Sequence, residues 1–95
     1  MITRQIRVWG RVQGVGFRFF TQQLAIQLEI TGTVQNKIDG SVLAVAQGEP
    51  NAVSRFIERV KASTSPYGRV DRYEECTLLD APLFTKFEKI GRAHV

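Results

Sequence analysis

Hydrophobic and polar residues alternate with a period of two in the first part of the chain, from Arg4 to Val12. The apolar positions on one face are Ile6, Val8 and Val12. The positions on the other face are charged or amphipathic: Arg7, Trp9 and Arg11. Because the side chains of a β-strand point to opposite faces in turn, this pattern predicts a strand with one buried face.

Two later segments have helical spacing instead. The first runs from about Arg18 to Leu28, with an apolar stripe of residues three or four positions apart: Phe17, Phe20, Leu24 and Leu28. The second follows Pro50, a residue suited to a first helical turn, and has the apolar stripe Val53, Phe56, Ile57 and Val60. Both stripes predict amphipathic helices that pack one face against a core.

The rest of the pattern predicts four short strands: 33–36, 41–47, 70–78 and 84–89. Asp39-Gly40, between the first two of them, is a hairpin signal. The order is therefore β-α-β-β-α-β with one extra terminal strand, which predicts an α+β, ferredoxin-like split βαβ fold with two helices on one face of an antiparallel sheet. We expect one domain over residues 1–89, and we expect residues 90–95, which follow neither period, to be a non-native or disordered tail.

Composition narrows the class of protein. The 95 residues, 43% of them hydrophobic, suffice for one small core. No apolar run reaches the roughly 20 residues of a membrane span, and the first residues lack the apolar core of a signal peptide. We therefore expect a soluble, cytoplasmic protein with no membrane partner. We also expect a monomer with no nucleic-acid partner. The net charge of +4 is compatible with an anionic small substrate and also with weak nucleic-acid binding, so charge alone does not choose.

Residues that could bind a metal or act as nucleophiles are scarce. Cys76 is the only cysteine and His94 the only histidine, and neither has a partner at the spacing of metal ligands. An ordinary strand residue is the more common role for a cysteine in the surroundings of Cys76. We expect neither a metal nor another cofactor.

The segment between the first strand and the first helix carries two glycines followed by an arginine. Gly14 and Gly16 can adopt positive φ, which lets successive N–H groups converge on an anion at the positive end of the helix dipole. Arg18 would add a planar fork that suits a phosphate. A tight turn with an exposed arginine is the alternative, and a short glycine loop by itself does not exclude it.

Asn36 is a second candidate, because it ends a predicted strand shortly before the Asp39-Gly40 turn. Asparagine is common beside turns for its own backbone hydrogen bonding, and spacing alone favours that role. Whether Asn36 lies near the glycine loop does not follow from the pattern.

Two motifs resemble those of the acylphosphatases. Residues 10–25, GRVQGVGFRFFTQQLA, resemble that family's phosphate-loop signature, and residues 32–48, GTVQNKIDGSVLAVAQG, resemble its second signature. The resemblance implies the ferredoxin-like fold and a metal-free enzyme that hydrolyses acyl phosphates to a carboxylate and inorganic phosphate. It implies that Arg18 and Asn36 are catalytic, Asn36 by positioning the attacking water. The phosphate-binding residues that it implies are Gln13, Gly14, Val15, Gly16, Phe17 and Arg18.

The chain departs from this family pattern at two positions. Glu29 stands where the family usually has glycine at the end of the first helix, and a left-handed residue there would cost roughly 1–2 kcal/mol. Thr33 stands where an aromatic commonly follows the glycine at position 32. Both departures are expected to affect stability and edge packing rather than chemistry.

Two other classes share parts of the pattern. The same signature opens the larger hydrogenase maturation factors that use carbamoyl phosphate, but those carry zinc-binding cysteine pairs that this sequence does not contain. A ferredoxin-like RNA-binding module is a different class, and it would read bases with aromatic residues on a basic strand. The segment SVLAVAQG has no aromatic residue, so a stand-alone enzyme is the favoured interpretation.

Overall fold

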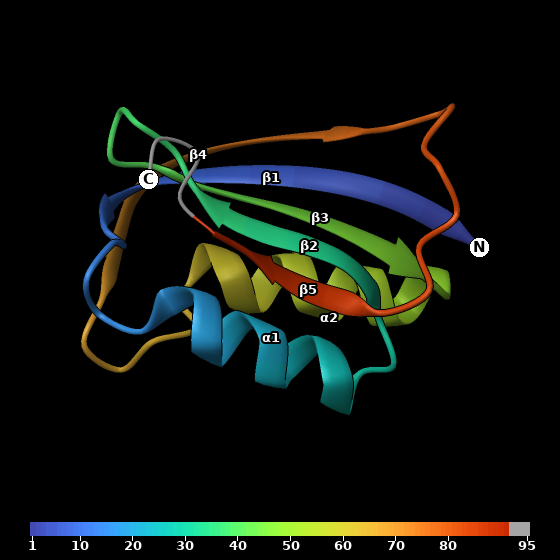
Figure 1. The fold of residues 1–95 in the computed structure, drawn as a ribbon, viewed down its shortest axis with the longest axis horizontal. Coiled ribbons are helices and arrows are strands. Elements are labelled where there is room, and N and C mark those ends of the chain that lie inside the picture. Colours follow the sequence, from blue (N-terminus) through green and yellow to red (C-terminus); the bar gives the residue numbers. More distant parts are fainter. Residues whose placement is uncertain (92–95) are drawn as a thin grey trace.

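Five strands form one mixed sheet in the computed structural model, which describes residues 1–91, and two helices cover one face of the sheet (Figure 1). In chain order the elements are β1 (Ile2–Arg11), α1 (Phe17–Gln27), β2 (Thr31–Asn36), β3 (Val42–Gly48), α2 (Pro50–Lys61), β4 (Arg69–Thr77) and β5 (Phe87–Ile90). The predicted ferredoxin-like α+β fold is confirmed.

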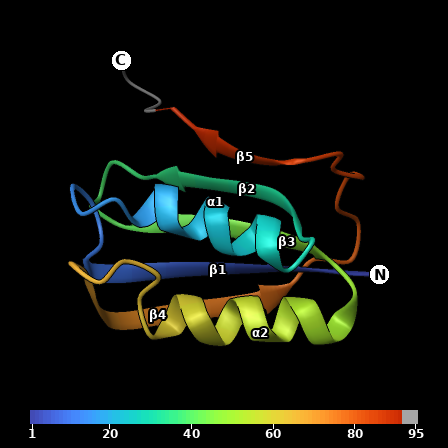
Figure 2. The ribbon, with the colours of Figure 1, turned by 90° about the horizontal axis from the view of Figure 1, so that it is seen from below.

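The strands lie in the order β4-β1-β3-β2-β5. The four strands of the split βαβ unit pair antiparallel, as predicted, whereas the added strand β5 runs parallel to β2, so the complete sheet is mixed. Helix α1 packs against β2 and β5, and α2 packs against β1 and β3 (Figure 2). The parallel pair β2 and β5 therefore ends at the same edge of the sheet as the start of α1 (Figure 1).

The core lies between the helices and the sheet, and the predicted stripes largely form it. All four stripe residues of α2 are buried: Val53, Phe56, Ile57 and Val60. In α1, Phe17 and Leu24 are buried, but Phe20 and Leu28 are only half-buried, because Thr21 and Ala25 occupy the centre of the buried face. Burying each large apolar side chain contributes about 1.5–3 kcal/mol, so these stripes fix how the helices lie on the sheet.

The end of α1 shows what the departure at Glu29 does. Glu29 adopts a left-handed conformation with φ of 58°, directly after the last turn of the helix. The next N–H, that of Ile30, donates to the carbonyl oxygen of Ala25 at 2.8 Å and closes the helix end. The chain thus keeps the turn that favours glycine and accepts the conformational cost of a side chain.

The connection from β4 to β5 crosses the far end of the sheet. Gln47 anchors this segment, because its buried side-chain amide donates to the carbonyl oxygen of Pro82 at 2.8 Å and accepts from the N–H of Phe84 at 2.9 Å. The final strand therefore begins at Phe87 rather than at residue 84, and it includes Ile90, which the sequence assigned to the tail. Residues 92–95 lie outside the described residues. No helix within residues 1–91 is long and apolar enough to cross a membrane.

Candidate active site

The glycine loop between β1 and α1 is fastened on two sides. The side-chain amide of Gln13 donates to the carbonyl oxygens of Lys37 and Ser41, both at 2.8 Å, and so ties the loop to the β2–β3 turn. On the other side the Ser65 hydroxyl donates to the carbonyl oxygen of Val15 at 2.6 Å. These hydrogen bonds fix the loop through Gln13 and Val15, which are two of the predicted phosphate-binding residues.

These carbonyl contacts decide where the N–H groups of the loop point. In a planar trans peptide the C=O group and the following N–H group point in opposite directions. Since the carbonyl of Val15 faces Ser65, the N–H of Gly16 faces away from Ser65. The carbonyl of Gly16 accepts from the N–H of Phe20 at 3.0 Å along the helix, so the N–H of Phe17 points out of the helix start.

Helix α1 begins without a cap. Gly16 occupies the N-cap position with φ of 77°, no side chain accepts a hydrogen bond there, and the first turn has no acidic residue. Within the described part of the chain, the N–H groups of residues 14–19 donate no hydrogen bond to other protein groups. An uncapped helix start presents unpaired donors and the positive end of the helix dipole, which suits an anion.

Arg18, in the first turn of α1, reaches from the helix toward the edge of the sheet. Its Nη1 donates to the carbonyl oxygen of Ile90, at the end of β5, at 2.6 Å. This contact fixes the half-buried guanidinium and leaves its other N–H donors available. Among residues 1–91, no carboxylate forms an ion pair with Arg18.

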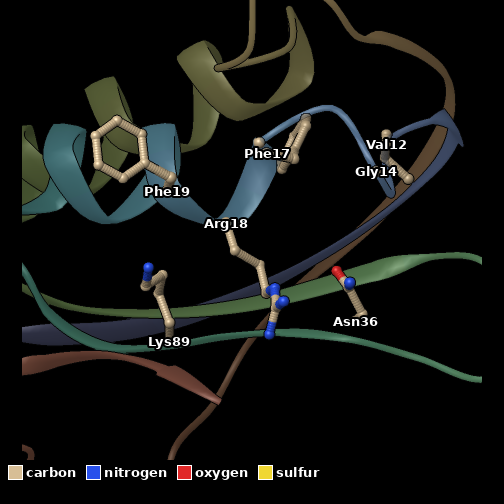
Figure 3. A pocket seen from close by; sticks show the side chains of 8 residues that line it. Val12, Gly14, Phe17, Arg18, Phe19, Asn36 and Lys89 are labelled. Carbon is tan, nitrogen blue, oxygen red and sulfur yellow. The ribbon is translucent and has the colours of Figure 1, made fainter. Parts of the chain in front are cut away.

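These groups line a pocket of about 200 Å³ at the start of α1 (Figure 3). The lining residues are Val12, Gly14, Gly16, Phe17, Arg18, Phe19, Asn36 and Lys89. Arg18 enters the pocket from α1 and Asn36 enters it from the end of β2, and the two side-chain ends approach one another (Figure 3). The fold thus brings together five of the predicted site residues, with Gln13 and Val15 supporting them from outside the lining.

Asn36 owes its place to the register of β2. Val34, two residues earlier, is fully buried on the helix-covered face, and Asn36 follows on the same face at the end of the strand. Its amide has no hydrogen-bond partner among residues 1–91, so its donors and its acceptor are free. The sequence left open whether Asn36 lies near the glycine loop. In the structure it lines the same pocket as Gly14 and Gly16.

Comparisons with known proteins agree on one family. A family model described as Acylphosphatase matches residues 4–89. The acylphosphatase of Lacticaseibacillus paracasei is 48% identical over 90 residues, which cover 95% of this chain and 97% of that protein. The chain belongs to the acylphosphatase family. The predicted class, a hydrolase of acyl phosphates, is confirmed at the level of this family.

Solved structures support the same assignment. The crystal structure of acylphosphatase from Bacillus subtilis superposes with a TM-score of 0.90 at 36% identity and covers 96% of this chain and all of that one (100%). Full-length HypF, in its phosphate- and nucleotide-bound form, matches with a TM-score of 0.85 at 28% identity. That match covers 95% of this chain and only 12% of HypF, so the likeness is to one small part of a much larger protein.

Three pocket residues of this acylphosphatase-family chain were not among the predicted site residues: Val12, which was expected only as a buried strand residue, Phe19 and Lys89. Phe19 lies off the apolar stripe of α1 and is half exposed, at 49% of its surface. Lys89 reaches the pocket because β5 pairs parallel with β2, where it lies opposite Val34. That pairing joins segments more than fifty residues apart, and no local pattern encodes it.

A hydrogen-bonded network around Asp39 holds the β2–β3 turn. The Asp39 carboxylate accepts from the N–H and the hydroxyl of Ser41, at 3.0 and 2.6 Å, and from the side chains of Arg7 and Trp9, at 3.1 and 3.2 Å. The hydrogen bonds from Ser41, followed by those from Trp9 and Arg7, hold the pKa of this carboxyl well below its usual range. The sequence identified Asp39 only as a turn residue, but the turn that it fixes is the one that binds Gln13.

Residues with metal-binding chemistry do not gather at this site. Within residues 1–91 there is no group of three or more histidine, cysteine, aspartate or glutamate side chains that could hold a metal ion. Cys76 is exposed on β4, and His94 lies outside the described residues.

Proposed function

We propose that this chain hydrolyses acyl phosphates without a metal, holding the phosphate with residues 13–18 and positioning the attacking water with Asn36. One observation carries the proposal. Unpaired N–H groups, a guanidinium and a free amide converge on a single pocket, and no carboxylate, histidine or cysteine of residues 1–91 lines it. Such a site can bind and orient a phosphate, and its lining residues within 1–91 include no imidazole, thiol or carboxyl group for acid–base chemistry.

The phosphate is bound first. Its oxygens accept hydrogen bonds from the unpaired N–H groups of the glycine loop and the helix start, and from the remaining N–H donors of Arg18. A hydrogen bond to a charged partner is worth about 1.5–3 kcal/mol, so a few of them suffice for useful affinity. The positive end of α1 adds to the attraction.

Water then attacks phosphorus. The Asn36 amide accepts a hydrogen bond from this water or donates one to it, and so holds the water opposite the leaving group. Its role is limited to positioning, because an amide does not titrate and cannot act as a general base. The new bond forms between the water oxygen and phosphorus, and the bond between phosphorus and the acyl oxygen breaks. The water proton passes to a phosphate oxygen, so the products are a carboxylate and inorganic phosphate.

The leaving group explains why no general acid is needed. A carboxylate is a weak base and departs without protonation, whereas the alkoxide of an alkyl phosphate is a strong base and does not. Phosphoryl transfer otherwise depends mainly on positioning and on stabilising the phosphate charge, and the pocket offers both. Three further statements about this chain stay predictions: that it is cytoplasmic, that it is a monomer, and that it binds neither nucleic acid nor a membrane.

Phosphate release from acetyl phosphate in excess EDTA tests the proposal. We expect hydrolysis to persist in the chelator, with glycerol phosphate left intact by the same protein preparation. Loss of activity in EDTA that a divalent cation restores would contradict the metal-free mechanism. Hydrolysis of glycerol phosphate at a similar rate would contradict the role assigned to the leaving group.

A further inference from the structure

Lys89 lies on β5 at the far end of the pocket from Asn36. It follows the buried Phe87 by two residues, so it points to the helix-covered face of the sheet. Its Nζ lies 5.8 Å from the centre of the Phe19 ring, at the start of α1. In Figure 3, Gly14 and Asn36 lie at one end of the pocket, Phe19 and Lys89 at the other, and Arg18 between them.

The charge of Lys89 has no protein partner within residues 1–91. No carboxylate forms an ion pair with it, whereas Lys86, three residues earlier, lies 3.4 Å from the carboxylate of Glu88. Lys89 is therefore a cation without an ion-pair partner in residues 1–91, and it lies beside an aromatic ring at the opening of a pocket that also contains Arg18. A second anionic group is the partner that this arrangement lacks.

The direction of the reaction places the acyl group at this end. In phosphoryl transfer the attacking and leaving oxygens lie roughly in line through phosphorus. If Asn36 holds the water on one side of the phosphate, the acyl oxygen leaves on the opposite side. That side faces away from Asn36 and toward Phe19 and Lys89 (Figure 3).

We propose that Phe19 and Lys89 form the acyl-group subsite, and that Lys89 favours acyl phosphates whose acyl chain carries a second negative charge. The inference rests on the proposed function and names the substrate class of the same site. The Phe19 ring packs against the hydrocarbon part of the acyl chain, and the Lys89 ammonium meets the carboxylate at its end. Because the ammonium is exposed at the rim, its effect on selectivity is modest and is screened by salt.

Two substrates of matched length test this subsite. Butanoyl phosphate and succinyl phosphate have the same number of carbons, but the second ends in a carboxylate. We expect Lys89→Gln to lower kcat/KM for succinyl phosphate about two- to fivefold at low ionic strength, while kcat/KM for butanoyl phosphate stays within the error of the wild type. Addition of salt should reduce the difference. Lys86→Gln removes the same charge from the same segment outside the pocket, and it should leave the ratio of the two kcat/KM values unchanged.

Three outcomes would overturn the inference. Equal losses for both substrates would place Lys89 on the phosphate, and no loss for either would remove it from substrate binding. An equal change of the ratio in Lys86→Gln would reduce the effect to net charge. If the wild-type protein hydrolysed neither substrate, the proposed function itself would fail, a result that differs from hydrolysis of both without discrimination.

Discussion

Helix α2 begins at Pro50, and the side chain of Glu49 just before it accepts a hydrogen bond from the N–H of Ala52 at 3.3 Å. Helix α1 begins after Gly16, which has no side chain to accept such a bond. The start of α2 meets part of its own hydrogen-bonding need, whereas the start of α1 leaves its donors facing a pocket.

The charged residues at the ends of the two helices also differ: those of α2 complement the helix dipole and those of α1 do not. Around α2, Glu49 precedes the helix and Arg59 and Lys61 lie in its last turn. Around α1, Arg18 lies in the first turn and Glu29 follows the last one. Because a helix favours negative charge at its start and positive charge at its end, by about 0.3–1 kcal/mol each, the charges of α2 stabilise the helix and those of α1 do not.

The difference supports the proposal that the start of α1 binds the phosphate. A local arrangement that contradicts the physical preferences of a helix is expected where function requires it. A bound phosphate would supply both the missing acceptor and the missing negative charge at the start of α1. Arg18, Gly16 and Glu49 lie at the helix starts and Asn36 lies beside the start of α1, so variants of these four residues test the difference, with α2 as the internal control.

Removing Arg18 should have the largest effect. Arg18→Ala deletes the one guanidinium that residues 1–91 contribute to the pocket, so we expect kcat/KM for acetyl phosphate to fall by on the order of 10³ and inhibition by inorganic phosphate to weaken strongly. Arg18→Lys should recover only part of the activity, because an ammonium lacks the planar fork. Steady-state kinetics and phosphate inhibition measure both variants, and full activity in Arg18→Lys would show that charge alone suffices.

Removing the Asn36 amide should have the next largest effect and a different signature. In Asn36→Ala we expect turnover at saturation to fall by on the order of 10², because the water loses its positioning group. Inhibition by phosphate should stay within a few fold of the wild type, because the helix start and Arg18 are intact. A variant that loses phosphate inhibition but keeps its turnover would assign Asn36 to phosphate binding instead.

A side chain at the α1 start should have a smaller effect. Gly16→Ala forces a side chain into a backbone with φ of 77° and brings its Cβ to 3.3 Å from the Phe20 ring. We expect a loss of about 1–2 kcal/mol in unfolding free energy and a fall in kcat/KM of roughly tenfold. Gly40→Ala is the matched control, since φ is 92° and no atom lies within 4 Å of its added Cβ. A comparable activity loss in Gly40→Ala would mean that backbone strain, wherever it lies, lowers activity.

Removing the cap of α2 should have the smallest effect on chemistry. Glu49→Ala deletes the acceptor for the N–H of Ala52 and the negative charge at the helix start. We expect a loss of about 0.5–1 kcal/mol, seen as a fall in Tm of a few degrees, with kcat/KM unchanged. A clear fall in kcat/KM would show that the two helix starts are coupled, and the comparison would lose its control.

Much of the fold could be predicted from local pattern. The stripe from Val53 to Val60 and the alternation around Ile6 and Val8 are buried as predicted, because amphipathic periods report which face meets the core. The glycine loop could also be placed at a strand-to-helix junction, since that position follows from the order of the elements alone.

The site could be predicted only in part, because it depends on contacts between distant segments. Asn36 meets Arg18 through the register of β2, and Lys89 enters the pocket through the parallel pairing of β5, which a local pattern does not show. The supporting role of Gln13 likewise depends on a turn more than twenty residues away. The family motifs implied roles for Arg18 and Asn36, but only the structure shows which segments bring them into one pocket.

A titration of the ¹⁵N-labelled wild-type protein with inorganic phosphate, in which ¹H–¹⁵N NMR monitors the backbone amides, tests the central claim most directly. If the uncapped start of α1 holds the phosphate, the amide signals of residues 14–19 should shift in a saturable manner. The amides in the first turn of α2, residues 51–53, should not shift. Equal shifts at both helix starts, or saturable shifts confined to another part of the molecule, would contradict the account.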